Sequence, residues 1–358
     1  MNAKISAASR FASSSRRDWL KTFGLAGAGL LGARFVRGTA AAAPAAGAPR
    51  RSLRFAHITD IHLEPERGAH AGFVKCLHHL QSQADAPTLI VNTGDCIMDS
   101  MQQPAPRTQL QWDLWHKTLR DECSLPIEHT IGNHDCWGLN HAKSGTTGQE
   151  ARWGKQWALE GLGLQTPYRS FDRNGWHFIV LDSVEPYENS YKARLGAEQL
   201  AWLKRDLAAV PRGVPILVLS HIPIVSPGGL LNDAKETEAH DLNVAGGLMH
   251  LDAREIHTLF RQQGNVKLCL SGHLHILDRA TYDGVTYLSS GAVCSGWWKN
   301  VHLGRFDYGY ALVDLYADGS FTHEYVTYGW QTVPGADREG EPALKTTGEF
   351  PAVRKTSS

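Results

Sequence analysis

The stretch LRFAHIT at 53–59, followed at once by Asp60-Ile61-His62, decides how the chain folds. Apolar residues dominate its first seven positions, as is typical of a buried strand. The two polar side chains that follow are spaced two residues apart, so in extended backbone both project to the same side. A strand ending in such a pair predicts an open α/β sheet with a ligand site at the carboxyl ends of its strands.

The same alternation continues along the chain. Apolar runs predict further strands at 88–93, 127–131, 176–181, 214–220 and 266–271, and helical spacing of apolar residues predicts helices at 71–82, 108–122, 148–160, 197–209 and 252–263. Strand-like segments at 284–289, 309–315 and 321–327 add antiparallel strands near the C-terminus. This order predicts one α/β domain over 53–330.

Four further groups of polar residues follow predicted strands. They are Gly94-Asp95, Gly132-Asn133-His134-Asp135, His221 and Gly272-His273-Leu274-His275. Each group alone is weak evidence for a ligand site, because a single Asp after a strand is usually a turn residue. Together they place carboxylate, imidazole and amide donors, without thiolates, at one sheet edge. That mixture is typical of divalent Mn, Fe or Zn, and the donors suffice for two ions sharing one carboxylate.

In order and spacing from Asp60 to His275, these residues resemble the signature of the calcineurin-like metallophosphoesterases. Their compact spacing is similar to that of the cyclic-nucleotide phosphodiesterase branch. The resemblance implies an α/β fold, a four-layer α/β/β/α sandwich of two facing mixed sheets flanked by helices. It also implies the role of each site residue: Asp60, His62 and His275 would hold one ion, Asn133, His221 and His273 the other, Asp95 would bridge both, and His134 would be the catalytic residue that faces the substrate.

The resemblance implies a metal-dependent phosphoric ester hydrolase with two divalent ions (Mn²⁺, Fe²⁺ or Zn²⁺) as cofactors. A hydroxide bridging the ions would attack a small phosphate ester in line, and His134 would stabilise or protonate the leaving oxygen. Phosphodiesters such as cyclic nucleotides are the first expectation. A broad acid or neutral phosphomonoesterase is the main alternative, and a phospholipid-headgroup phosphodiesterase a lesser one. A noncatalytic metal- or phospholigand-binding protein would be expected to have lost a ligand or His134.

One position departs from the family pattern. Many relatives carry a second Asp three residues after the bridging one, to orient the catalytic His, whereas this chain has Met98 there and Asp99 one residue later. The sequence therefore leaves open whether Asp99 or Asp135 supports His134. The Tyr ligand of purple acid phosphatases is also missing after Asp95, so an Fe(III)–tyrosinate site is not expected.

The N-terminal segment predicts export. Residues 1–43 contain Arg16-Arg17, a short apolar stretch and a run of small residues, the layout of a twin-arginine-type signal. We therefore expect the export machinery as a partner and a periplasmic or extracellular location. A linker at 44–52 and a polar tail at 331–358 would flank the domain.

Charge and hydropathy exclude two classes of partner. The 36 basic residues equal the 36 acidic ones, which argues against a chain that grips a nucleic-acid polymer. No apolar run reaches the roughly 18 residues of a membrane span, so no integral membrane segment is expected.

The sequence allows two interpretations for each of three features: a long loop, three tryptophans and the cysteines. The long segment 226–250 is either a lid over the site or an insertion. Trp137 and the pair Trp297-Trp298 either contact substrate or brace the core. The six cysteines include no C-x-x-C pair, and buried free thiols are favoured over disulfides.

Overall fold

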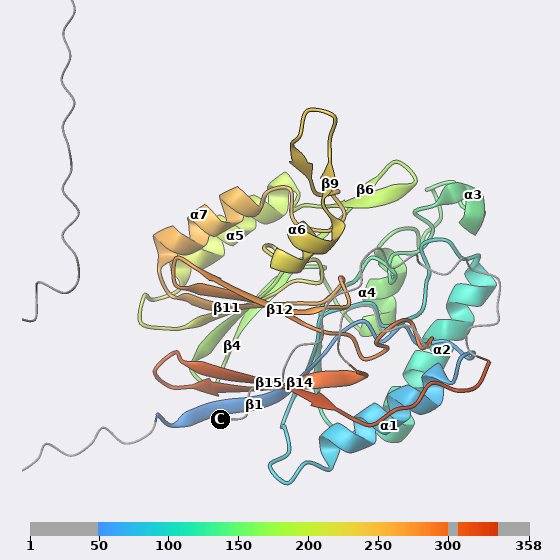
Figure 1. Cartoon of the computed structure of the whole chain (residues 1–358), viewed down its shortest axis with the longest axis horizontal. Coiled ribbons are helices and arrows are strands. Elements are labelled where there is room, and N and C mark those ends of the chain that lie inside the picture. Colours follow the sequence, from blue (N-terminus) through green and yellow to red (C-terminus); the bar gives the residue numbers. More distant parts are fainter. Residues whose placement is uncertain (1–48, 300–306, 336–358) are drawn as a thin grey trace, which may run out of the picture. The chain divides into compact units, whose positions relative to one another are not determined.

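The computed structural model describes residues 49–299 and 307–335, which belong to one compact unit, Ala48–Ser358. The predicted export signal at 1–43 and most of the predicted tail at 331–358 lie outside the described residues. In the described part, two sheets face each other and helices cover their outer faces (Figure 1). The predicted four-layer α/β/β/α sandwich is confirmed.

The first sheet joins the two ends of the domain. Its strands, in order across the sheet, are β15 (Phe321–Thr327), β14 (Gly309–Tyr316), β1 (Arg51–Ile58), β2 (Ile90–Asn92) and β3 (Ile127–His129). β1, β2 and β3 run parallel, and β14 and β15 pair antiparallel beside β1. Because β1 begins at Arg51, the strand includes the last two residues of the predicted linker.

The second sheet has a parallel centre and antiparallel edges. Its strands, in order, are β12 (Leu277–Tyr282), β13 (Val285–Ser290), β11 (Val266–Ser271), β8 (Ile216–Leu219), β5 (Trp176–Val180) and β4 (Arg169–Arg173). Side chains such as Phe55, Val91, Leu217 and Leu268 are buried between the two sheets. This apolar layer holds the sheets face to face, and their strands end at a shared edge.

Helices complete the outer layers. They are α1 (Ala69–Gln81) and α2 (Ala105–Glu122) on the first sheet, α5 (Ala197–Ala209) and α7 (Ala253–Gln263) on the second, and the short helices α3 (His141–Ser144), α4 (Gln156–Leu162) and α6 (Pro227–Asp233) (Figure 1). Two small hairpins project beyond α6, one of β6 (Val184–Tyr187) and β7 (Ser190–Ala193), the other of β9 (Lys235–Glu236) and β10 (Leu242–Asn243). None of the helices described here is long and apolar enough to cross a bilayer.

The helix predicted at 148–160 is wrong in its first half. Gly148 and Gly154 have φ values of 85° and 67°, left-handed conformations that interrupt a right-handed helix. The segment before Gln156 therefore forms turns, and α4 begins only there.

All six cysteines of the chain lie within the described residues and are free thiols. Five are buried, and Cys123 is partly exposed. The structure thus agrees with the interpretation of the cysteines as buried free thiols.

Candidate metal centre

The loops after five parallel strands carry the predicted site residues to one edge of the sandwich. Asp60 and His62 follow β1, Asp95 follows β2, and Asn133 and His134 follow β3. His221 follows β8, and His273 and His275 follow β11. Backbone hydrogen bonds hold neighbouring loops together. For example, the N–H groups of Ile61 and His62 donate to the backbone carbonyl of Asp95 at 2.9 and 3.0 Å.

Left-handed backbone marks the site. Five of the seven predicted ligands have positive φ although none is glycine: Asp60 (51°), His62 (46°), Asp95 (53°), His273 (72°) and His275 (50°). Such conformations cost free energy and cluster at functional sites, where the surrounding structure enforces them. They turn the side chains toward one another.

Two glycines permit the close approach of these loops. A Cβ on Gly132 would lie 2.0 Å from an Asp95 carboxylate oxygen, and one on Gly272 would lie 2.3 Å from an Asp60 oxygen. Any larger residue at either position would displace a carboxylate. Gly132 and Gly272 are therefore requirements of packing.

One group of donors gathers around the ends of β1 and β11. The His62 Nε2 and His275 Nε2 atoms lie 3.1 Å apart, and the Asp60 Oδ1 atom lies 3.4 Å from His275 Nε2 and 3.9 Å from His62 Nε2. All three side chains are buried. These are the residues that the sequence assigns to the first ion.

The second group gathers around the ends of β3, β8 and β11. His221 Nε2 lies 3.0 Å from Asn133 Oδ1, and the donor atoms of Asp95, His221 and His273 lie within 4.8 Å of one another. A single oxygen of Asp95, Oδ2, is 3.2 Å from His221 Nε2 and 3.6 Å from His62 Nε2. Asp95 thus stands between the two groups, as a bridging carboxylate must.

Backbone carbonyls fix the orientation of all four imidazoles. The contacts are His62 Nδ1 with the Met98 oxygen (3.2 Å), His221 Nδ1 with Thr93 (2.8 Å), His275 Nδ1 with Ser295 (2.8 Å) and His273 Nε2 with Gly247 (2.8 Å). Since a carbonyl only accepts, the ring nitrogen in each contact carries the proton. The other nitrogen then presents a lone pair, the form in which histidine binds a metal.

The donor set fits divalent cations. With both Nδ1 atoms protonated, the lone pairs of His62 Nε2 and His275 Nε2 face each other at 3.1 Å, which is repulsive unless positive charge lies between them. Burial lowers the pKa of His62. Burial also opposes protonation of His275, but Cys294 and Asp60 beside it raise its pKa. Burial likewise opposes protonation of His221, but Asp95 raises the pKa of His221 to about 9. Asp60 and Asp95 thus favour positive charge beside His275 and His221.

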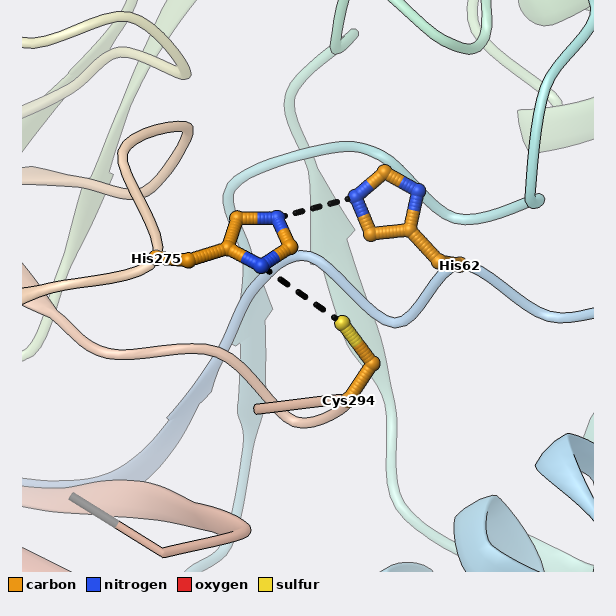
Figure 2. Close-up of side chains that lie close together, drawn as sticks. All are labelled: His62, His275 and Cys294. Carbon is orange, nitrogen blue, oxygen red and sulfur yellow. Dashed lines mark hydrogen bonds between the residues drawn. The ribbon is translucent and has the colours of Figure 1, made fainter. Parts of the chain in front are cut away.

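Cys294 lies beside this cluster, and its Sγ atom lies within 4.8 Å of ligand atoms of His62 and His275. Its Sγ atom contacts His275 Nδ1 at 3.8 Å, whereas the Nε2 atom on the opposite side of the ring faces His62 (Figure 2). An ion held by the two Nε2 atoms would lie on the far side of the imidazole from the thiol. For an ion in that position the donors would be nitrogen and oxygen, the mixture that the sequence predicts.

Asp99, and not Asp135, is the carboxylate beside His134. Asp99 Oδ1 lies 3.4 Å from His134 Nδ1. Asp135 instead accepts from the backbone N–H groups of Gly132, Asp95 and Cys96 at 2.8–3.0 Å, so it joins two ligand loops. Burial opposes protonation of His134, but Asp95 and Asp99 raise its pKa. The question left open by the sequence is therefore answered by geometry.

The tryptophans divide between the two interpretations. Trp137 is buried and donates to the Gln103 oxygen, and Trp298 is buried and donates to the oxygens of Ile61 and His62. Both brace the structure. Trp297 alone of the three lies against site imidazoles, with its ring centroid 4.0 Å from that of His62.

The segment 226–250 is folded and contacts the site. It contains α6 and the β9–β10 hairpin, and Gly247 supplies the carbonyl that fixes His273. His250 at its end contacts Ser220 Oγ (3.2 Å) and Asp252 Oδ1 (3.0 Å). Although this trio has the residue types of a hydrolase triad, Ser220 is buried and donates to the Ile222 oxygen. The trio anchors the segment to β8.

The structure brings all seven predicted ligand side chains and His134 together, and their roles in metal binding and catalysis stay a prediction. The sequence did not predict the four carbonyl anchors, because backbone groups leave no residue signal. Trp297 was one of several aromatic candidates, and the sequence had no means of separating it from Trp298.

This fold, with histidine, aspartate and asparagine donors at the strand ends, is suited to a metal-dependent phosphoric ester hydrolase. The sequence profile of the calcineurin-like phosphoesterases matches residues 53–277, and the chain belongs to that family. The noncatalytic alternative is thereby set aside.

Similar proteins include two cyclic-nucleotide phosphodiesterases. A 3′,5′-cyclic-nucleotide phosphodiesterase of Nostoc sp. is 25% identical over 75% of this chain and 90% of its own length. A cAMP/cGMP dual specificity phosphodiesterase of Mycobacterium tuberculosis is 26% identical over 69% of each chain. They support placement in the branch of the family that the sequence predicts.

Two other similarities are coarser. Purple acid phosphatase 15 of Arabidopsis thaliana is 33% identical, but over only 37% of this chain and 24% of its own. The structure of a dimetal phosphatase from Danio rerio has a TM-score of 0.54 at 15% identity and covers 78% of this chain and 97% of its own, a likeness of fold.

Proposed function

We propose that the chain hydrolyses small phosphodiesters, with cyclic nucleotides as the first candidates, at a centre of two divalent ions. One ion would be held by Asp60, His62 and His275, the other by Asn133, His221 and His273. The observation that carries the proposal is the position of Asp95 Oδ2, 3.2 Å from His221 Nε2 and 3.6 Å from His62 Nε2. A carboxylate between two imidazole groups is suited to hold two cations at once.

Each part of the site has a chemical task. Two bound cations would neutralise the phosphoryl oxygens and lower the pKa of water. The buried carboxylates and carbonyl-anchored imidazoles keep the donors fixed, so little reorganisation is needed during the reaction. His134, with Nδ1 toward Asp99, directs its other nitrogen away from that carboxylate, where it can hold a proton at the leaving oxygen.

The preference for diesters is supported by the two phosphodiesterases, which match most of this chain. A phosphomonoesterase is the second candidate, and the local similarity to purple acid phosphatase 15 favours it. The three residues after Asp95 are Cys96, Ile97 and Met98, so the proposal includes no tyrosinate-bound iron.

A substrate panel separates the two candidates. With Mn²⁺, we expect the protein to hydrolyse cAMP and bis-p-nitrophenyl phosphate with kcat/KM at least about tenfold above that for p-nitrophenyl phosphate, a difference of about 1.4 kcal/mol in transition-state stabilisation. A chelator should abolish all three activities, and acid should weaken them because protonated imidazoles do not bind metal. The reverse order of substrates would favour the monoesterase, and activity that survives chelation would contradict the metal mechanism.

We also propose that the protein is exported by the twin-arginine route, on the sequence of residues 1–43 alone. Replacing both arginines, Arg16→Lys and Arg17→Lys, should leave the precursor inside the cell while its activity stays unchanged. Fractionation and immunoblotting measure this. Unchanged export of the double variant would contradict the proposed route.

A further inference from the structure

The indole of Trp297 lies against three imidazoles of the proposed centre at once. Its ring centroid is 4.0 Å from that of His62 and 4.7 Å from that of His275, with which it is stacked at 24°. The His134 ring meets it edge-on at 5.2 Å. Trp297 therefore contacts two proposed ligands of one ion and the proposed catalytic residue.

The chain holds Trp297 in this place at a conformational cost. Ser295, Trp297 and Trp298 have φ values of 47°, 63° and 60°, and a non-glycine residue in this region is strained by about 1–3 kcal/mol. Buried Trp298 fixes the backbone through its indole N–H, which donates to the oxygens of Ile61 and His62 at 2.9 and 3.0 Å. The carbonyl of Ser295 anchors His275 at the same time. One short segment thus positions both the indole and a proposed ligand.

The contact is more than filling of space. Imidazoles that give a lone pair to a cation become electron-poor, and the electron-rich face of an indole attracts electron-poor rings and cations. His62 also needs a second restraint, because its Nδ1 contact with the Met98 oxygen, at 3.2 Å, is the longest of the four carbonyl contacts. Packing of the indole against His62 limits rotation of that ring.

We propose that Trp297 is a positioning residue of the metal centre, which strengthens binding of the ion held by Asp60, His62 and His275 and links those ligands to His134. The proposal rests on the proposed function, since it concerns the same centre. The proposal predicts an effect on one ion only. The indole contacts His62 and His275, whereas His221 and His273, proposed for the other ion, contact each other with ring centroids 5.1 Å apart.

The first test measures metal affinity. Calorimetric titration of the full chain with Mn²⁺ measures the affinity of each binding step. Trp297→Ala should weaken the affinity of one of the two steps by about 10–100-fold, the usual effect of removing a group that orients a ligand. Trp297→Phe, which keeps an aromatic face, should restore most of the affinity. Trp202→Ala is the matched control, because Trp202 on α5 packs against Tyr168, with ring centroids 4.9 Å apart, and is not among the proposed site residues.

The second readout is spectroscopic and independent of activity. Paramagnetic Mn²⁺ should quench tryptophan fluorescence of the wild-type protein, and Trp297→Phe should remove a distinct part of that quenching although ten tryptophans remain of the eleven. Thermal unfolding with chelator present verifies that each variant is folded; if Trp297→Ala is not, Trp297→Leu replaces it.

The outcomes are distinguishable. If the wild-type protein binds no Mn²⁺, the proposed function fails. If it binds two ions and the folded Ala or Leu variant binds both with unchanged affinity, the centre stands and the role of Trp297 is refuted. Weakening of one step, with rescue by phenylalanine, is the result that the proposal requires.

Discussion

Replacing Asp95 by asparagine is expected to lower kcat by about 10³-fold or more and to reduce the number of bound metal ions. The cause is the loss of the one carboxylate that faces both imidazole groups. Metal ions contribute several kcal/mol to stabilisation of the transition state, and each 1.4 kcal/mol is a factor of ten. Steady-state kinetics with saturating Mn²⁺ and elemental analysis of the dialysed protein measure the two effects.

Asparagine makes this a strict test. Its side-chain oxygen can still accept from the backbone N–H of His134, which donates to Asp95 Oδ1 at 2.8 Å, so the loop geometry is retained. Asp113→Asn, at an exposed position of α2, removes the same charge far from the site and should change neither quantity. An Asp95→Asn protein with normal turnover and normal metal content would show that Asp95 does not bridge two ions.

His134→Ala is expected to lower kcat by about 10²–10⁴-fold while the bound metal stays at the wild-type level. The imidazole is beside Asp99 and is 17% exposed, and its removal leaves all seven proposed ligand side chains in the chain. Asp99→Asn should have a smaller effect, about 10–100-fold, because Asp99 acts through His134. Kinetics and metal analysis of both variants test the assignment.

The double variant supplies the control for this pair. If Asp99 acts only by orienting His134, then adding Asp99→Asn to His134→Ala should cost little further activity, a non-additivity expected of residues that function as a unit. Loss of metal from His134→Ala would show instead that His134 is a ligand. Equal, additive losses would separate Asp99 from His134.

The central strands and the edge strands β3 and β15 were predictable, whereas the edge strands β4 and β12 of the second sheet were not. The central strand β8 (ILVL) carries only apolar side chains, and β11 (VKLCLS) is buried except at Lys267, patterns that predict strands buried on both faces. β4 and β12 escaped prediction because these edge strands, RSFDR and LDRATY, mix charged with apolar residues and are partly exposed. The pairing of β14 with β1 joins residues more than 250 positions apart, which no local pattern indicates.

The candidate site followed from the sequence more completely than the fold. Strand prediction placed Asp60 and Asp95 near one another at the edge of one sheet. It was wrong in expecting His221 on the same sheet, because β8 belongs to the second sheet, and only the family resemblance implied the shared centre. The contacts that orient these side chains could not be predicted from the sequence. The carbonyl of Gly247 contacts His273 only because the distant segment 226–250 reaches the site, and Trp297 faces the imidazoles only because Ser295, Trp297 and Trp298 adopt left-handed backbone.

The central claim is that two cations share one centre, and an anomalous diffraction map of crystals grown with Mn²⁺ tests it most directly. We expect two anomalous peaks, one bound by Asp60, His62 and His275, the other by Asn133, His221 and His273, with Asp95 bound to both. A single peak, a peak bound to the Cys294 thiol, or peaks only at the protein surface would contradict the account.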